Sequence, residues 1–303
     1  MKRVSIIIVT YNSERDIFDC VRSIHEYADI PLSEVELIVV DNNSREPDAM
    51  FAKLRDIWGD DIVLIKNTHN GGYGQGNNVG IRRATAPVIL IMNPDVRLAT
   101  PFFATPLSAF AKDEKLIMYG MKQWYTPTRQ SRSSFLCTYR MNGYLRTLLE
   151  AFCNRVNWYL PSLMHLSGSC FFVRKAPFEI VGLFDESIFM YGEEEDIRWR
   201  LAKQFGAHFH FDKSMRYLHL TSERPPSVAT QLKYLEVSMI LNEKKGYPRT
   251  KMVRNFIQIY KIKYWRECLR RFLGRPHREY EMLKQLLPIL RKEQQQLKSE
   301  NRC

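Results

Sequence analysis

The sequence predicts an α/β fold, with a mostly parallel central sheet, flanking helices and a basic helical C-terminal tail. Short apolar runs rich in β-branched residues alternate with helical patterns over the first 100 residues, as in βαβ units. The formal charge is +12, and residues 243–303 hold 17 Lys and Arg against 6 Glu, a surplus of 11. The preceding part of the chain is therefore nearly neutral. We expect one domain over 1–242 and a separate tail over 243–303.

Four apolar runs predict four strands, over 4–9, 35–40, 62–65 and 88–92. Between the first two runs, Ile17, Cys20, Val21 and Ile24 recur at helical spacing, which predicts a helix over 14–27. The fourth run is bounded by prolines and is too short for a typical helix, so a buried strand is favoured. A turn and a further strand are expected within 166–174, and a helix near 177–181.

Polar residues follow each predicted strand where the chain leaves the sheet. Asn12 follows the first strand, Asp41 the second, a stretch that starts at Asn70 the third, and Asp95 the fourth. Ligands of open α/β sheets bind beyond the carboxyl ends of the strands, so this convergence predicts a binding site. Asp95 is then a candidate for holding a metal or a charged substrate, although Asn-Pro-Asp is also an ordinary turn sequence.

Two segments leave their structure open. The glycines between 71 and 80 suit a loop that brings backbone close to a ligand, and they lack the spacing of dinucleotide-binding and P-loop motifs. Residues 131–166 mix arginines with aromatic residues, which fits either a core helix around 145–152 or a mobile segment that binds an acceptor.

Four consecutive acids, Glu193 to Asp196, begin a predicted helix that runs to Phe205. Acidic residues are common at the positive N-terminus of a helix. Because the cluster follows Phe189 and Tyr191, it is also suited to hold a carboxylate of raised pKa, as a general base requires.

The whole chain shows neither a membrane span nor a targeting segment. No apolar run reaches the ~18 residues of a transmembrane helix, and the N-terminus leads directly into a strand pattern. The six cysteines are scattered without a Cys-x-x-Cys pair, so we expect reduced thiols and no zinc site. We expect a soluble cytoplasmic protein.

The tail contains a predicted amphipathic helix over 253–273, with an apolar stripe flanked by Arg and Lys. This helix can pack its apolar face on the preceding domain. Alternatively, it can lie on an anionic membrane leaflet, which would make the protein peripheral on the inner face of the plasma membrane. Because the charge is local, a nucleic-acid partner is not expected.

The order and spacing of five motifs resemble the family 2 inverting glycosyltransferases, with the GT-A nucleotide-diphospho-sugar transferase fold, over roughly residues 1–225. The motifs are Val-Ser-Ile-Ile-Ile-Val-Thr-Tyr-Asn, Val-Val-Asp-Asn-Asn-Ser, Asn-Gly-Gly-Tyr-Gly-Gln-Gly-Asn-Asn-Val-Gly, Met-Asn-Pro-Asp-Val, and Gly-Leu-Phe-Asp-Glu through Arg200. The Asn-Pro-Asp motif is similar to that of the rhamnosyltransferase-like polysaccharide branch. The resemblance implies a nucleotide-binding half over about 1–100 and an acceptor-binding half over about 101–242.

The resemblance also implies roles for individual residues. Asp95 and His219 would bind Mg or Mn, and Asp41 would contact the nucleobase of the donor. The other donor-binding candidates are Thr10, Tyr11, Asn12, Asn70, Gly71, Gly72, Asn77, Asn78 and Asn93.

The catalytic base is expected within the acid cluster. The family pattern Glu-Asp-x-Asp-x-x-x-Arg has the first Asp as base, and here Glu194 takes that place with one extra methylene. This departure leaves Glu193 and Asp196 as alternatives. The implied activity is transfer of a hexose, such as rhamnose, from a dTDP- or UDP-sugar to a glycan or lipid-linked acceptor in surface polysaccharide synthesis.

Two other classes compete with this interpretation. A sugar-nucleotide nucleotidyltransferase would show a glycine-rich, basic loop after the first strand, where this chain has Thr-Tyr-Asn-Ser-Glu. A non-catalytic protein of nucleic acid or membrane surfaces is suggested by the basic tail alone, and steep salt dependence of polynucleotide binding would favour it.

Overall fold

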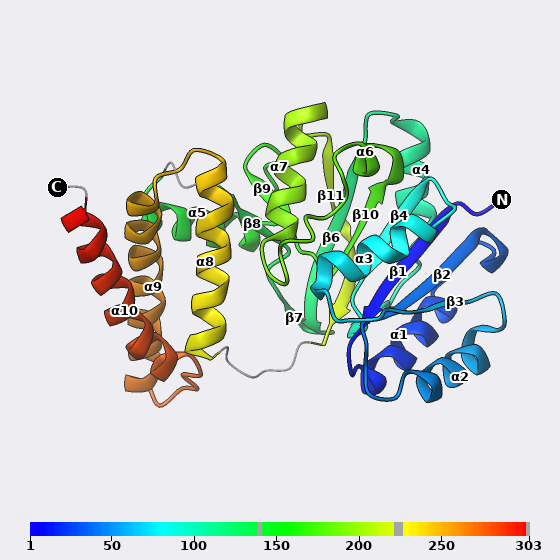
Figure 1. Ribbon diagram of the computed structural model, residues 1–303, viewed down its shortest axis with the longest axis horizontal. Coiled ribbons are helices and arrows are strands. Elements are labelled where there is room, and N and C mark those ends of the chain that lie inside the picture. Colours follow the sequence, from blue (N-terminus) through cyan, green and yellow to red (C-terminus); the bar gives the residue numbers. More distant parts are fainter. Residues whose placement is uncertain (138–140, 221–226, 301–303) are drawn as a thin grey trace. The chain divides into compact units, whose positions relative to one another are not determined.

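The computed structural model describes residues 1–137, 141–220 and 227–300 (Figure 1). The chain divides into two compact units. The first comprises Met1–Phe135 and Tyr159–Thr221, and the second comprises Leu136–Trp158 and Ser222–Cys303. This division differs from the predicted boundary at 242, because both an internal segment and the helix before residue 242 belong with the C-terminal helices.

The first unit is built on one large sheet with the strand order β3-β2-β1-β4-β10-β6-β11-β5. The strands are β1 (Val4–Thr10), β2 (Val35–Asp41), β3 (Val63–Lys66), β4 (Val88–Met92), β5 (Val96–Arg97), β6 (Met118–Thr126), β7 (Arg129–Gln130), β8 (Ser134–Leu136), β9 (Met164–Leu166), β10 (Cys170–Arg174) and β11 (Phe209–His219). Strand β7 pairs with β6, and β8 and β9 form a separate two-stranded sheet.

The first four strands are parallel, with β1 paired to β2 on one side and to β4 on the other. Beyond β4 the sheet is mixed: β10 runs antiparallel to both β4 and β6, whereas β11 is parallel to β6. Strand β11 also pairs antiparallel with β5, so that His219 lies beside Val96. The predicted α/β class is confirmed, and the carboxyl ends of β1, β2 and β4 lie at one edge of the sheet.

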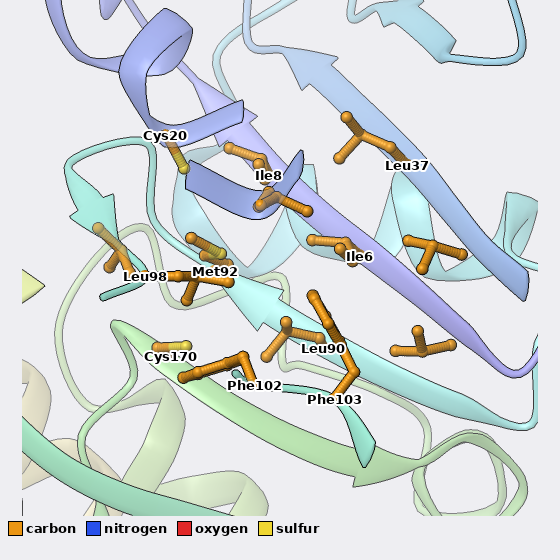
Figure 2. Packing of buried hydrophobic residues seen from close by; sticks show 14 of the residues in the cluster. Ile6, Ile8, Cys20, Leu37, Leu90, Met92, Leu98, Phe102, Phe103 and Cys170 are labelled. Atoms are coloured by element: carbon orange, nitrogen blue, oxygen red, sulfur yellow. The ribbon is translucent and has the colours of Figure 1, made fainter. Parts of the chain in front are cut away.

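Helices cover both faces of this sheet. They are α1 (Glu14–Glu26), α2 (Pro47–Trp58), α3 (Gly72–Arg83), α4 (Ala104–Lys112), α6 (Lys175–Ile180) and α7 (Glu193–Phe205), with a short 3-10 helix η1 (Leu32–Glu34). Alternate residues of β1 point to opposite faces: Ile6 and Ile8 pack with α1, α2 and α4, whereas Ile7 packs with α3, α6 and α7. Figure 2 shows the first of these two cores.

The second unit consists of α5 (Gly143–Arg155), α8 (Val228–Lys244), α9 (Arg249–Phe272) and α10 (Tyr280–Glu300). Leu235 of α8, Phe256 of α9 and Leu286 of α10 share one apolar core. The predicted apolar stripe of 253–273 therefore packs within this helical unit in its first half, whereas Trp265 and Phe272 in its second half are exposed. None of the helices in the described ranges combines the length and apolar composition of a membrane span.

Candidate active site

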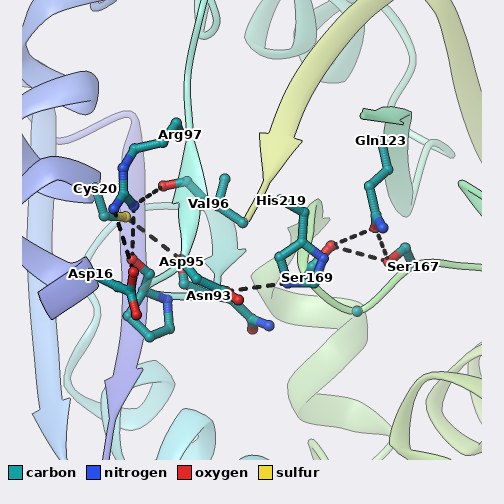
Figure 3. A network of polar contacts seen from close by, with 12 residues as sticks. Asp16, Cys20, Asn93, Asp95, Val96, Arg97, Gln123, Ser167, Ser169 and His219 are labelled. Carbon is teal, nitrogen blue, oxygen red and sulfur yellow. Dashed lines mark hydrogen bonds and ion pairs between the residues drawn. The ribbon is translucent and has the colours of Figure 1, made fainter. Parts of the chain in front are cut away.

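Asp95 and His219 meet at the edge of the sheet, as the resemblance implied. His219 ends β11, and its Nε2 lies 3.2 Å from Asp95 Oδ1 (Figure 3). The Leu220 amide donates to the Asp95 carbonyl at 2.9 Å, which fixes the backbone of this pair. Strand pairing between β11 and β5 thus brings together two residues that are far apart in the sequence.

The Asp95–His219 pair fits a hexacoordinate divalent cation. Two adjacent ligands of an octahedral ion with bonds of about 2.1 Å lie about 3 Å apart, close to the observed separation of 3.2 Å. Both side chains keep some exposed surface, and the buried His219 Nδ1 has no hydrogen-bond partner in the part of the chain that the structure describes. No group of three or more His, Cys, Asp or Glu suited to a metal occurs among the described residues. Since Mg²⁺ is often bound by one or two protein ligands plus substrate phosphates, two ligands suffice.

The ends of β1 and β2 form one hydrogen-bonded corner. Thr10 Oγ1 donates to Asp41 Oδ1 at 3.1 Å, and the Ser44 amide donates to Asp41 Oδ2 at 2.8 Å. Ser44 Oγ in turn accepts from the Asn12 amide at 2.8 Å. Thr10 and Asp41 are fully buried, whereas Tyr11 keeps 53% of its surface exposed. Of the predicted donor-binding residues here, Thr10 and Asp41 therefore shape the corner, whereas Tyr11 and Asn12 are exposed.

The glycine-rich stretch is a helix, α3, rather than the predicted ligand-binding loop. A Cβ on Gly76 would lie 2.7 Å from Val9 Cγ1, and one on Gly80 would lie 2.5 Å from Ile7 Cγ2. The glycines thus let α3 approach β1 closely. At the start of the helix, the Gly72 amide donates to Asn70 Oδ1 at 3.0 Å. The Tyr73 amide donates to the Phe189 carbonyl at 3.0 Å, so these two amides are engaged with the protein rather than free to meet a phosphate.

Asn77 and Asn78 are buried, and Asn78 holds the segment that precedes α7. Asn78 Oδ1 accepts from the Phe184 amide at 3.0 Å, while Nδ2 donates to the Phe184 carbonyl and to Glu186 Oε1, both at 2.9 Å. This hydrogen bond from Asn78 is the main cause that lowers the pKa of Glu186. Asn77 Nδ2 donates to the Tyr73 carbonyl at 2.9 Å. Neither asparagine, predicted as a donor contact, has a free surface in this structure.

Gly72→Ala is expected to destabilise the first unit. Gly72 has φ +87°, and a Cβ there would lie 2.0 Å from the Phe189 carbonyl oxygen. Backbone strain alone typically costs ~1–3 kcal/mol, and the clash adds to it. Gly182→Ala is the matched control, because Gly182 has φ +88° and no atom within 4 Å of an added Cβ. Urea unfolding should give the larger loss for Gly72→Ala; equal losses would show that the contact with Phe189 is unimportant.

The acid cluster, Glu193 to Asp196, separates into distinct environments at the start of α7. Burial, followed by the neighbouring charge of Glu194, raises the pKa of Glu193 to about 8. Its Oε1 is buried without a hydrogen-bond partner among the described residues. Asp196 accepts from Arg200 Nε at 2.8 Å and lies 2.6 Å from Arg200 Nη2. Glu194 is half-buried.

Glu194 lies against Gly168, in a loop whose role the sequence did not indicate. A Cβ on Gly168 would fall 1.9 Å from Glu194 Oε1. In the same loop, defined here as the Ser167–Ser169 loop, the Ser169 carbonyl accepts from the Asn93 amide at 2.8 Å and the Gly168 carbonyl accepts from Tyr73 Oη at 2.6 Å. The loop therefore connects Asn93, two residues before Asp95, with the acid cluster.

A buried glutamine holds the Ser167–Ser169 loop from behind. Gln123 Oε1 accepts from Ser167 Oγ at 2.6 Å and from Ser169 Oγ at 2.8 Å (Figure 3). It also accepts from Tyr217 Oη at 3.0 Å. Gln123 lies on β6 and Tyr217 on β11, so the sheet itself positions the loop. A glycine between two serines directly before a strand was the only sequence signal for this element.

Glu193→Gln should remove a pH dependence of stability. The carboxyl has an ordinary pKa of 4.5, and the folded protein raises it to about 8, so the folded state holds the proton more tightly. Its stabilising contribution is complete below about pH 4.5 and is lost as the pH rises through about 8. Relative to wild type, the variant should gain stability between about pH 5 and about pH 9, by an amount on the order of a few kcal/mol. Urea unfolding at both pH values measures this, with the exposed Glu46→Gln as control; parallel pH profiles for wild type and Glu193→Gln would contradict the buried, protonated state.

Comparison with known proteins gives consistent matches. Residues 5–182 match the family described as Glycosyl transferase family 2. The low-salt glycan biosynthesis hexosyltransferase Agl10 of Haloferax volcanii is 30% identical over 209 residues, covering 66% of this chain and 62% of the relative, so the match spans less than two thirds of the relative's own length.

Solved structures share the fold. S. aureus TarS 1-349 in complex with UDP-GlcNAc has a TM-score of 0.53 and 15% identity, covering 86% of this chain and 72% of that chain. Mannosyltransferase PcManGT from Pyrobaculum calidifontis, in complex with GDP-Man and Mn²⁺, has a TM-score of 0.53 and 16% identity, covering 96% and 73%. The GT-A fold expected from the sequence is confirmed.

Proposed function

Because the chain belongs to glycosyltransferase family 2, we propose that it transfers a hexose from a nucleoside-diphosphate sugar to an acceptor hydroxyl with inversion. The observation that carries the proposal is the connection of two chemically different sites. The Asp95–His219 pair suits a metal-bound diphosphate, and the Ser167–Ser169 loop joins its strand end to Glu194. A glycosyltransferase must hold the donor diphosphate and remove the acceptor's proton at points close enough for one donor sugar to reach both.

Asp95 and His219 are proposed to hold Mg²⁺ or Mn²⁺, as suggested by the Mn²⁺ in the PcManGT complex. When bound, the ion neutralises negative charge on the leaving diphosphate. Through that ion, the two side chains would hold the phosphate end of the donor at the edge of the sheet. The buried corner of Thr10, Asp41 and Ser44 keeps Asn12 in place.

The donor is proposed to be a UDP- or dTDP-sugar. Among the solved structures of this fold, TarS holds UDP-GlcNAc, although PcManGT holds GDP-Man. The exposed Tyr11 ring directly after β1 provides a flat apolar surface on which a nucleobase can stack. Asn70, Gly71, Gly72, Asn77 and Asn78 would then support the pocket through α3 rather than contact the diphosphate.

Glu194 is the proposed general base, which removes the proton from the acceptor hydroxyl at its carboxylate. Asp196 is held by Arg200 through two guanidinium nitrogens, so its carboxylate already has a partner within the protein. Glu193 is buried beneath the site, where its raised pKa favours the neutral acid. Glu194 is half-buried, so its carboxylate stays accessible to an acceptor hydroxyl.

The acceptor is proposed to be a glycan or a lipid-linked glycan, in line with the glycan-biosynthesis name of the archaeal relative. Contact with an anionic membrane surface is also proposed, now through the second half of α9 alone. Trp265, Leu269 and Phe272 are exposed there, and arginines 266, 270 and 271 lie among them. The alternative of a sugar-nucleotide nucleotidyltransferase is no longer favoured, because this chain matches glycosyltransferase family 2.

A panel of nucleotide sugars tests the proposal. We expect one or a few of them to release nucleoside diphosphate in the presence of Mn²⁺ or Mg²⁺, and a chelator to abolish the release. Release that is unchanged by the chelator would exclude the role of the Asp95–His219 pair. Absence of release from every sugar, with and without a soluble glycan acceptor, would contradict the proposed activity.

A further inference from the structure

The helical unit contains a cavity of about 830 Å³. This is within the roughly 300–1,000 Å³ typical of ligand pockets. Its lining residues come from three helices: Tyr144 from α5, Lys261 and Trp265 from α9, and Lys284 and Arg291 from α10. It lies entirely within the second unit and shares no residue with the candidate active site.

The walls of this cavity are fixed by packing. The Gly143 amide donates to Gln258 Oε1 at 2.7 Å, and a Cβ on Gly143 would lie 2.2 Å from the Asn255 carbonyl oxygen. Asn255 Nδ2 donates to the Met141 carbonyl at 3.0 Å. The start of α5 is therefore locked to α9, while Leu287 of α10 belongs to the core shared with α9.

Three cations line the cavity without a counterion. Lys261, Lys284 and Arg291 make no ion pair or hydrogen bond within the described ranges, and no acid is among the residues that line the cavity. In contrast, Arg249 of the same unit is surrounded by Glu236, Glu243 and Glu293. Three unpaired cations around one hollow create a positive potential that favours a multiply charged anion. Arg and Lys together suit phosphate oxygens in particular.

The rest of the lining is apolar and aromatic. Leu287 is buried, Trp265 is 76% exposed at the rim, and Pro288 lies between Lys284 and Arg291 on the same helix. An anion without an apolar part would leave the exposed Trp265 and Pro288 in water. An anionic headgroup attached to a hydrocarbon chain would satisfy the cations and cover Trp265 and Pro288 as well.

We propose that this cavity binds an amphiphile whose phosphate or diphosphate headgroup is joined to an apolar chain, that is, the lipid carrier of an acceptor. The inference rests on the proposed function, since it names the kind of acceptor on which the transferase acts. The headgroup lies among Lys261, Lys284 and Arg291, and the first part of the chain lies against Trp265 and Pro288.

Titration calorimetry of the full-length protein with farnesyl diphosphate tests the inference. A chelator is present throughout, so that the metal-dependent nucleotide site does not hold the diphosphate. Inorganic diphosphate supplies the headgroup alone, and farnesol supplies the chain alone. We expect farnesyl diphosphate to bind more tightly than either part; equal binding of inorganic diphosphate would overturn the proposal of a lipid.

Two charge-matched triple variants separate this cavity from general surface charge. The variant Lys261→Gln/Lys284→Gln/Arg291→Gln should weaken farnesyl diphosphate binding on the order of a hundredfold, since each basic residue near an anionic headgroup contributes about a factor of five to ten. The control Lys251→Gln/Lys292→Gln/Lys298→Gln removes the same charge from α9 and α10 outside the lining. Equal weakening by both triples would overturn the proposal.

Donor chemistry provides the remaining control. The cavity variant should keep metal-dependent release of nucleoside diphosphate in the absence of acceptor, and its thermal unfolding should match that of wild type. If wild type releases no nucleoside diphosphate from any sugar, the proposed function fails, while the farnesyl diphosphate titration still decides whether the cavity binds the amphiphile.

Discussion

Asp95→Asn is expected to lower metal-dependent donor turnover by on the order of a hundredfold or more. The substitution keeps the size of the side chain but deletes the anionic oxygen that faces His219 Nε2 at 3.2 Å. Loss of one such electrostatic element typically costs a few kcal/mol of transition-state stabilisation. Turnover is measured as nucleoside diphosphate release over a Mn²⁺ series, and Mn²⁺ binding is followed independently by electron paramagnetic resonance.

The same experiment includes a control for charge. Asp56→Asn removes an exposed carboxylate from α2 and should leave turnover unchanged. The fold of Asp95→Asn should persist, because the backbone of Asp95 is held through its carbonyl to the Leu220 amide. Near-normal turnover of Asp95→Asn at limiting Mn²⁺ or Mg²⁺ would show that the metal assignment is wrong.

Glu194→Gln is expected to reduce sugar transfer by roughly a hundredfold to ten-thousandfold, the usual contribution of a general base. Donor affinity should be retained, because the base acts on the acceptor hydroxyl and not on the nucleotide. Transfer is measured with a soluble acceptor, and donor binding by titration of the nucleotide sugar with Mn²⁺.

Parallel variants of the neighbouring acids decide between the three candidates. Glu193→Gln should retain transfer, since the carboxyl it replaces is already favoured in its neutral form. Asp196→Asn should lose stability through its contact with Arg200 rather than lose the chemistry itself. An active Glu194→Gln together with an inactive neighbour would move the base to that neighbour.

The sequence predicted the elements whose signal is local. The apolar runs marked β1 to β4 to within one residue. The signal is strongest for β1, β2 and β4, because strands buried on both faces are almost uniformly apolar. Asp95 was predicted from its place after the fourth strand, whereas His219 came from the resemblance alone, since the meeting of the two depends on the pairing of β5 with β11. The turn at Ser167–Ser169 was predicted, but its contacts with Asn93 and Tyr73 were missed, because they use backbone carbonyls, which any residue provides.

Two predictions failed for reasons of tertiary packing. Gly76 and Gly80 were interpreted as a loop that approaches a ligand, but the group they approach is β1. The tail was predicted to be separate from residue 243 onward, whereas its first apolar half forms a core with α8, and α5 belongs to the same unit. Periodicity shows that a face is apolar, but it does not show which helix covers that face.

The contact between Gly168 and Glu194 has a consequence for natural variation in this family. An added side chain at position 168 would meet the end of a flexible glutamate and could displace its carboxylate without disturbing the backbone. Such a chain would remain well folded and would still carry every acid of the cluster. Its sequence would look active although the proposed base, Glu194, was out of place. The residue at this position can therefore help to separate working transferases from inactive relatives that a comparison of the acidic motif alone would group together.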